Sequence, residues 1–188
     1  EPIDYNHPAD LVGITVLTRF ALHAYEIADR FREKGVKVIL GGLHPSALPD
    51  EAIQHADAVV IGEAEGIWKS VIRDFENNSL KKFYKNTDFP DLACVKSPRR
   101  DLFNKARYLF TAMVQTTRGC PFNCNFCSVT KFFGGKFRTK PVEFVIKEIR
   151  SLKSKFIGFS DDNIFGNKIY AHKLFNALKY EGVIWMAK

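Results

Sequence analysis

Short apolar runs alternate with helical segments over the first eighty residues, and this alternation limits the chain to few folds. Three runs have the length and the Val, Ile and Leu content of buried strands: residues 11–17, 36–40 and 57–61. Helices are predicted after each run: residues 19–34, 49–55 and 67–77, with residues 43–48 as a loop. This order predicts parallel βαβ units with right-handed crossovers. A doubly wound domain usually has five or more strands, so we expect further strands before residue 1.

A second alternation follows in the C-terminal half. Strands are predicted at residues 108–117, 155–160 and 183–186, and helices at residues 141–153 and 168–181. The polar stretch 78–107 is interpreted as a linker. The predicted fold class is α/β: a truncated Rossmann-like domain at residues 1–77, then the first βα units of a partial TIM-like barrel at residues 108–188. This is half a barrel at most, so we expect the chain to be a piece of a longer protein.

Composition excludes several classes of protein. The net charge of +7 permits anionic partners, but no RNA-reading motif accompanies it, so nucleic-acid binding is not favoured. No run approaches the ~20 apolar residues of a membrane helix. The first residues lack the basic and then apolar layout of a signal peptide, and we expect a cytoplasmic protein.

Three of the four cysteines lie within eight residues, which argues for a metal site in a reducing compartment. Cys120, Cys124 and Cys127 have the spacing C-x3-C-x2-C and directly follow a predicted strand. Three thiolates on one loop can each bind one iron of a cubane, which leaves the fourth iron open to a small ligand. The alternative is structural zinc, for which Cys94 or His172 would have to supply the fourth ligand.

The cysteine motif after a strand resembles the signature of the radical S-adenosylmethionine (SAM) enzymes, over about residues 108–188. The resemblance implies that Cys120, Cys124 and Cys127 hold a [4Fe–4S] cluster whose open iron chelates SAM. One electron then cleaves SAM and releases a 5′-deoxyadenosyl radical. It further implies that Phe126 lies against the adenine, and that an electron donor such as ferredoxin or flavodoxin supplies the electron.

A stretch after the second strand of that family holds the amino group of SAM. At the corresponding place the chain has Ser160, Asp161 and Asp162, to which the resemblance assigns this role. A solvated turn at the end of a strand is the equally supported alternative. No catalytic residue is predicted beyond the three cluster ligands.

Residues 8–76 resemble the cobalamin-binding domain that precedes the radical domain in one branch of this family. Its matching pieces are Asp10–Thr15, Leu40–Ser46 and Val59–Glu65. Glycines end two of the predicted parallel strands, where doubly wound sheets bind ligands. The resemblance assigns cobalamin contacts to these residues: Gly41, Gly42, His44, Gly62 and Glu63. His44 lacks the Asp-x-His-x-x-Gly context of a cobalt ligand, so a loop residue is the favoured interpretation.

The resemblance implies methyl transfer to an unactivated carbon, or another radical rearrangement, on a small organic or lipid-like substrate. Two alternatives stay open. A methylthiotransferase acting on transfer RNA shares the three cysteines but needs a second cysteine set in its N-terminal domain. A zinc-stabilised basic module that binds nucleic acid is the non-enzymatic alternative.

Overall fold

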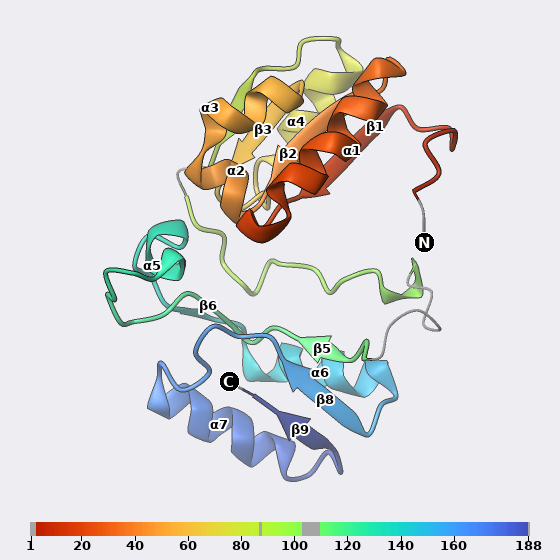
Figure 1. Cartoon of the computed structure of the whole chain (residues 1–188). Helices are drawn as coiled ribbons and strands as arrows, with labels where there is room; N and C mark the ends of the chain where they lie inside the picture. Colours follow the sequence, from red (N-terminus) through yellow and green to blue (C-terminus); the bar gives the residue numbers. More distant parts are fainter. Residues whose placement is uncertain (1–2, 87, 103–109, 188) are drawn as a thin grey trace. The chain divides into compact units, whose positions relative to one another are not determined.

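The computed structural model describes residues 3–86, 88–102 and 110–187 (Figure 1). The chain divides into two compact units, Glu1–Pro90 and Asp91–Lys188. The domain bounds predicted from the sequence, residues 1–77 and 108–188, remain a prediction.

The first unit is built on a four-stranded parallel sheet in the order β1-β2-β3-β4. Its strands are β1 (Leu11–Thr15), β2 (Lys37–Gly41), β3 (Ala58–Ile61) and β4 (Phe83–Lys85). The predicted parallel βαβ arrangement is confirmed. The interpretation of residues 78–107 as a linker was wrong in part, because Phe83, Tyr84 and Lys85 pair with β3 and extend the sheet. Tyr84 is buried, and its flanking residues are exposed, which is the alternation of an edge strand.

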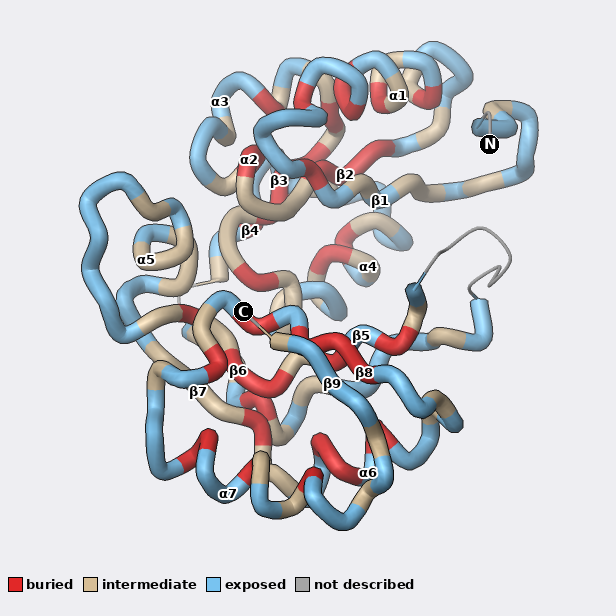
Figure 2. Tube along the Cα trace, turned by 60° about the horizontal axis from the view of Figure 1, so that its bottom comes forward, coloured by how far each residue is buried: buried red, intermediate tan, exposed pale blue. Residues whose placement is uncertain are grey.

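Helices cover both faces of this sheet. They are α1 (Ala21–Glu33), α2 (Leu43–Ala47), α3 (Pro49–Ala52) and α4 (Trp68–Glu76), with 3₁₀ turns at Thr18–Phe20 and Ile53–His55. Val38, Leu40 and Val59 pack with α1 on one face, whereas Ile39 and Val60 pack with α4 on the other. The two central strands, β2 and β3, are therefore buried on both faces, which explains their continuous apolar sequence (Figure 2). Residues 43–47 are helical, so the predicted loop at 43–48 was wrong.

The second unit has a parallel sheet in the order β5-β8-β9, made of β5 (Met113–Val114), β8 (Phe156–Phe159) and β9 (Ile184–Met186). An antiparallel pair, β6 (Thr117–Arg118) and β7 (Arg138–Thr139), stands beside it. The helices are α5 (Ser128–Phe132), α6 (Val142–Leu152) and α7 (Lys168–Leu178), and a 3₁₀ turn spans Arg100–Leu102. The strands β5, β8 and β9 with the helices α6 and α7 are the predicted βα units of a partial barrel, whereas α5 and β7 were not predicted.

The single strand predicted at residues 108–117 is divided in the structure. Residues 108 and 109 lie outside the described residues. Of the remainder, only Met113 and Val114 (β5) and Thr117 (the start of β6) are in strands, and these two strands belong to different sheets. The apolar faces of α6 and α7 pack on Val114, Ile157 and Phe159 and form the core of this unit. In neither unit does a described helix have the length and apolar content needed to cross a membrane.

Candidate functional site

The cysteine loop of the second unit is closed at its base by β6 and β7. Thr117 and Arg118 pair with Thr139 and Arg138, so the two ends of the segment between residues 118 and 138 lie side by side. Gly119 lies between this pair and Cys120 with a φ of +86°. A Cβ atom there would overlap the carbonyl oxygen of Lys136 across the loop. Only glycine therefore fits at the entrance of the loop.

All three cysteines of the loop are free thiols, and they differ in exposure. Cys124 is exposed, whereas Cys120 and Cys127 are half-buried. A turn joins two of them, since the Cys127 N–H donates to the Cys124 carbonyl at 3.1 Å. Among the residues that the structure describes, no three His, Cys, Asp or Glu side chains converge closely enough to hold one metal ion. A cubane binds its thiolates on separate irons, so three thiols spread along one loop fit it.

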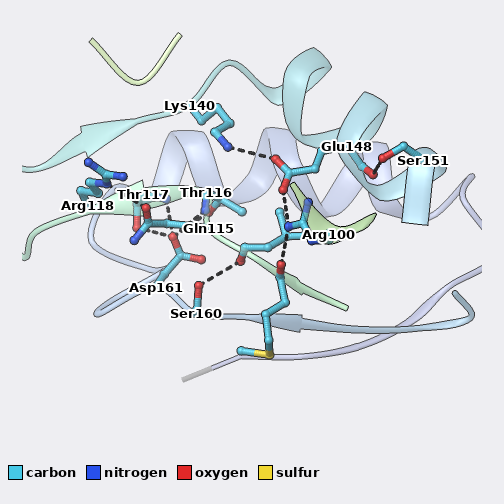
Figure 3. Close-up of polar contacts among 12 residues, drawn as sticks. Arg100, Gln115, Thr116, Thr117, Arg118, Lys140, Glu148, Ser151, Ser160 and Asp161 are labelled. Atoms are coloured by element: carbon cyan, nitrogen blue, oxygen red, sulfur yellow. Dashed lines mark hydrogen bonds and ion pairs between the residues drawn. The ribbon is translucent and has the colours of Figure 1, made fainter. Parts of the chain in front are cut away.

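Asp161 anchors the strand that leads into the cysteine loop (Figure 3). Its side chain is 3% exposed, and its Oδ1 accepts hydrogen bonds from Thr116 and Thr117. Thr116 donates from its N–H at 2.8 Å and from its hydroxyl at 3.1 Å, and both groups of Thr117 also donate. Burial raises the pKa of the Asp161 carboxyl, although these hydrogen bonds oppose the shift. The end of β8 thereby fixes the base of the cysteine loop.

A buried ion cluster supports the start of α6 behind this base. Lys140 pairs with Glu148 at 3.0 Å, and Arg100 pairs with the other carboxylate oxygen of Glu148 (Figure 3). Arg100 also donates to the Met113 carbonyl at 2.7 Å. Tyr170 of α7 donates its hydroxyl to the Lys140 carbonyl at 2.7 Å. Residue 100, the edge strand β5 and two helices are thus tied together around one carboxylate.

The carboxyl ends of the strands in the first unit form a connected edge. Ser46 links two of the loops, because its hydroxyl donates to the Gly42 carbonyl at 2.7 Å and accepts from the Gly62 N–H at 2.9 Å. The Asn86 side-chain amide, just after β4, donates to the Glu63 carbonyl at 3.0 Å and to the Glu65 carbonyl at 2.8 Å. These bonds hold the loops after β2, β3 and β4 in a fixed arrangement.

Two models of known families match the chain in the same order as its two units. The B12 binding domain matches residues 5–72, and the Radical SAM superfamily matches residues 114–185. The chain belongs to the radical SAM superfamily, in the branch that carries a B12-binding domain. The resemblance predicted from the sequence is therefore confirmed, and the zinc-stabilised nucleic-acid module is not supported.

Two curated relatives align with most of the length of this radical SAM chain. It is 37% identical over 172 residues to the bacteriochlorophyllide d C-8(2)-methyltransferase of Chlorobaculum tepidum. This alignment covers 87% of the chain and 38% of the relative. It is 30% identical over 188 residues to the bacteriochlorophyllide d C-12(1)-methyltransferase of the same organism. This alignment covers 95% of the chain and 41% of the relative. The chain thus spans about two fifths of the length of these relatives.

A solved structure shares the fold. The radical SAM methyltransferase TsrM from Kitasatospora setae, with cobalamin and a [4Fe-4S] cluster bound, superposes with a TM-score of 0.71 at 15% identity. The match covers 93% of this chain and 42% of TsrM. The predicted fold, a Rossmann-like B12-binding domain followed by part of a radical SAM barrel, is confirmed by this match and by the two family models.

The residues predicted to contact SAM lie in different environments in the radical SAM unit. Phe126 is 89% exposed beside the last cysteine, and its ring is free to cover a planar ligand. Ser160 and Asp162 are exposed at the carboxyl end of β8, whereas Asp161 between them is buried. The one Asp161 oxygen that accepts hydrogen bonds serves Thr116 and Thr117. Asp161 thus has an anchoring role that the sequence did not indicate, and its contact with SAM remains a prediction.

The residues predicted to contact cobalamin also differ from one another. Gly42 is required by the chain's own packing, because a Cβ atom there would lie 2.9 Å from Thr15 Cγ2. A Cβ atom on Gly41 or Gly62 would meet its nearest neighbour at 3.7 Å, so these positions leave room. Glu63 is buried, and its main-chain carbonyl accepts the bond from Asn86.

His44 is turned toward the protein interior. It is 4% exposed, and its Nε2 lies 2.9 Å from the Tyr25 hydroxyl and 3.3 Å from Glu51 Oε1. Burial and Glu51 raise the pKa of Tyr25 to about 12. These contacts occupy Nε2, one of the two ring nitrogens that can bind a metal. His44 lies in α2, so its interpretation as a loop residue was wrong, and its relation to cobalamin remains a prediction.

Sequence reasoning assigned no role to several side chains that organise the two sites. Ser46 and Asn86 join the loops of the B12-binding unit, and Asn163 contacts a cysteine of the radical SAM unit. Each acts on a residue between 16 and 43 positions away along the chain. The polar residue that follows a parallel strand is the sequence signal they share.

Proposed function

We propose that the chain belongs to an enzyme that transfers a methyl group by radical SAM chemistry with cobalamin as methyl carrier. The observation that carries this proposal is the loop of three free thiols behind Gly119, in a chain that also has a B12-binding unit. Both curated relatives described above are named methyltransferases. A methylthiotransferase is the weaker candidate, because the B12 binding domain matches residues 5–72 and both relatives are named methyltransferases.

Cys120, Cys124 and Cys127 would hold a [4Fe–4S] cluster through one thiolate each. When bound, this cluster supplies the electron that splits SAM into methionine and a 5′-deoxyadenosyl radical. The partial exposure of the three thiols leaves them accessible to iron and to SAM. Three protein ligands leave one iron for the amino and carboxylate groups of SAM.

The chain's own residues would position SAM and limit its contact with water. Phe126 would stack on the adenine, and Ser160 and Asp162 would present polar oxygens to the amino group from the end of β8. Asp161 keeps Thr116 and Thr117 in place below the loop, so the thiolates keep one arrangement. The remaining substrate contacts belong to the whole protein.

The B12-binding unit would accept cobalamin at the carboxyl edge of its sheet. Gly41 and Gly62 leave room for close approach of a flat macrocycle, and Ser46 holds their loops together. His44 of α2 keeps its contact with Tyr25, so cobalamin would bind without His44 as a ligand.

We further propose a small organic or lipid-like substrate and a small electron-transfer protein, ferredoxin or flavodoxin, as the source of the electron. The relatives' substrates are chlorophyll-type pigments by name, which are small molecules. We also propose a cytoplasmic location, because low-potential clusters and free thiols persist in reducing compartments.

The test is anaerobic reconstitution of the chain with iron and sulfide, followed by electron paramagnetic resonance after reduction. We expect a cubane signal that changes when SAM is added. Cys124→Ala should lose the signal, and Cys94→Ala should keep it, because Cys94 lies outside the loop and is also exposed. A Cys124→Ala protein with the full signal and an unchanged response to SAM would contradict the proposal.

A further inference from the structure

The loop after β8 reaches the cysteine loop at a second point, beyond Asp161. Asn163 lies in this loop, and its side-chain amide donates to the sulfur of Cys120 at 3.5 Å. The two residues are 43 positions apart in the sequence, so the contact is produced by the fold. Sulfur accepts hydrogen bonds at longer distances than oxygen does because its radius is larger.

The orientation of the Asn163 amide is fixed by its other contacts. Its Oδ1 accepts the Phe165 N–H at 3.1 Å, and its main-chain carbonyl accepts the Gly166 N–H at 3.2 Å. The acceptor oxygen is thereby assigned to Phe165, which leaves the NH₂ group for the sulfur. Ile164 is fully buried and anchors the loop in the core.

Gly166 brings the same loop against the residue that follows Cys120. A Cβ atom on Gly166 would lie 2.8 Å from Pro121 Cδ and 2.6 Å from Phe137 Cε2. Neither distance is compatible with a side chain, so glycine permits the approach. Two independent contacts, one polar and one steric, therefore place this loop beside Cys120.

We propose that Asn163 is a positioning residue that raises the reduction potential of the cluster by hydrogen bonding to the Cys120 thiolate. This inference rests on the proposed cluster. Reduction adds negative charge that spreads onto the sulfurs, so a donor at a sulfur stabilises the reduced form more than the oxidised form. The radical step begins with this reduction, and the hydrogen bond therefore makes it easier for a given electron donor.

The first test is the midpoint potential of the reconstituted chain, titrated with dithionite and followed by electron paramagnetic resonance. Asn163→Asp keeps the acceptor for Phe165 and removes the donor to sulfur. We expect the equilibrium between reduced and oxidised cluster to shift at least tenfold toward the oxidised form. For a one-electron couple this corresponds to a midpoint potential about 59 mV lower. Asn163→Ala, which adds no charge, should shift the potential in the same direction.

Asn167→Asp is the matched control. Asn167 is exposed, lies four positions along the same loop and caps α7 by accepting the Tyr170 N–H at 3.0 Å. The substitution keeps that acceptor and adds the same charge without touching a cysteine. We expect an unchanged potential. Equal shifts in Asn163→Asp and Asn167→Asp, with none in Asn163→Ala, would overturn the inference.

The second test detects the hydrogen bond to the cluster directly. Chain labelled with ¹⁵N in the asparagine side-chain amides should show a ¹⁵N coupling to the reduced cluster, and Asn163→Asp should abolish it. A cubane in the unsubstituted chain without this coupling, or with the same potential in all variants, would refute the role of Asn163 alone. Failure of the unsubstituted chain to form any cubane would refute this role and the proposed function together.

Discussion

Removal of the Asp161 side chain should destabilise the radical SAM unit strongly. In Asp161→Ala the N–H groups of Thr116 and Thr117 lose their acceptor, and both threonines are 0% exposed. A buried donor without a partner costs about 1–3 kcal/mol, so the two N–H groups together cost about 2–6 kcal/mol. The two hydroxyls can turn toward other acceptors and are left out of this sum. With a urea m-value of about 2 kcal/mol/M, the unfolding midpoint should fall by about 1–3 M.

The two tryptophans of the chain allow each unit to be followed separately. Trp185 lies in β9 of the radical SAM unit and stacks on Phe175 with the ring centroids 4.7 Å apart. Trp68 lies in α4 of the B12-binding unit. In a Trp68→Phe background, urea unfolding followed by fluorescence reports Trp185 alone. If Asp161→Ala leaves the unfolding midpoint of this background unchanged, the anchoring role of Asp161 is refuted.

Asp161→Asn is the matched control and also gives the sign of the pH dependence. It keeps an acceptor oxygen for the two threonines, so it should lose less stability than Asp161→Ala. Burial raises the folded-state pKa of Asp161 above its unfolded value near 3.9. The protonated form is therefore favoured by folding, and its contribution is complete below that value and is lost as the pH rises through the folded pKa. We therefore expect the unfolding free energy of the unsubstituted protein to fall relative to that of Asp161→Asn as the pH rises from about 3.9 through the folded-state pKa of Asp161.

Three further predictions concern other parts of the chain. Gly119→Ala should reduce the iron bound per chain after reconstitution because a Cβ atom collides with a carbonyl across the loop, and Gly182→Ala, with open space around it, should not. Lys140→Met should destabilise the radical SAM unit by about 3 kcal/mol in urea unfolding, since Glu148 is buried and loses one of its two cationic partners. His44→Asn should leave the absorption spectrum of bound cobalamin unchanged, because the histidine Nε2 already contacts a tyrosine hydroxyl; a spectral shift would identify His44 as a ligand.

The elements with strong local signals were predictable from the sequence. Continuous apolar strands and amphipathic helices in alternation indicated parallel sheets, and both parallel sheets are present. The three closely spaced cysteines after a predicted strand were sufficient to indicate one loop at the end of a strand. These signals are short-range, so they do not depend on how distant segments pack.

The features that the sequence did not reveal depend on contacts between distant segments. Strand β4 is three residues long and becomes a strand only through its pairing with β3. Asp161 reads as a turn residue in the sequence, and its burial follows from its contact with Thr116, 45 positions earlier. Asn163 carries no local signal that distinguishes it from a residue in a solvated turn.

The most direct measurement is Mössbauer and electron paramagnetic resonance spectroscopy of the chain, reconstituted with ⁵⁷Fe and sulfide without oxygen, before and after SAM is added. Three cysteine ligands predict one [4Fe–4S] cluster per chain, in which one iron changes its environment on SAM binding. Four equivalent irons that do not respond to SAM, or a protein that takes up zinc and no cubane, would contradict a three-thiolate site.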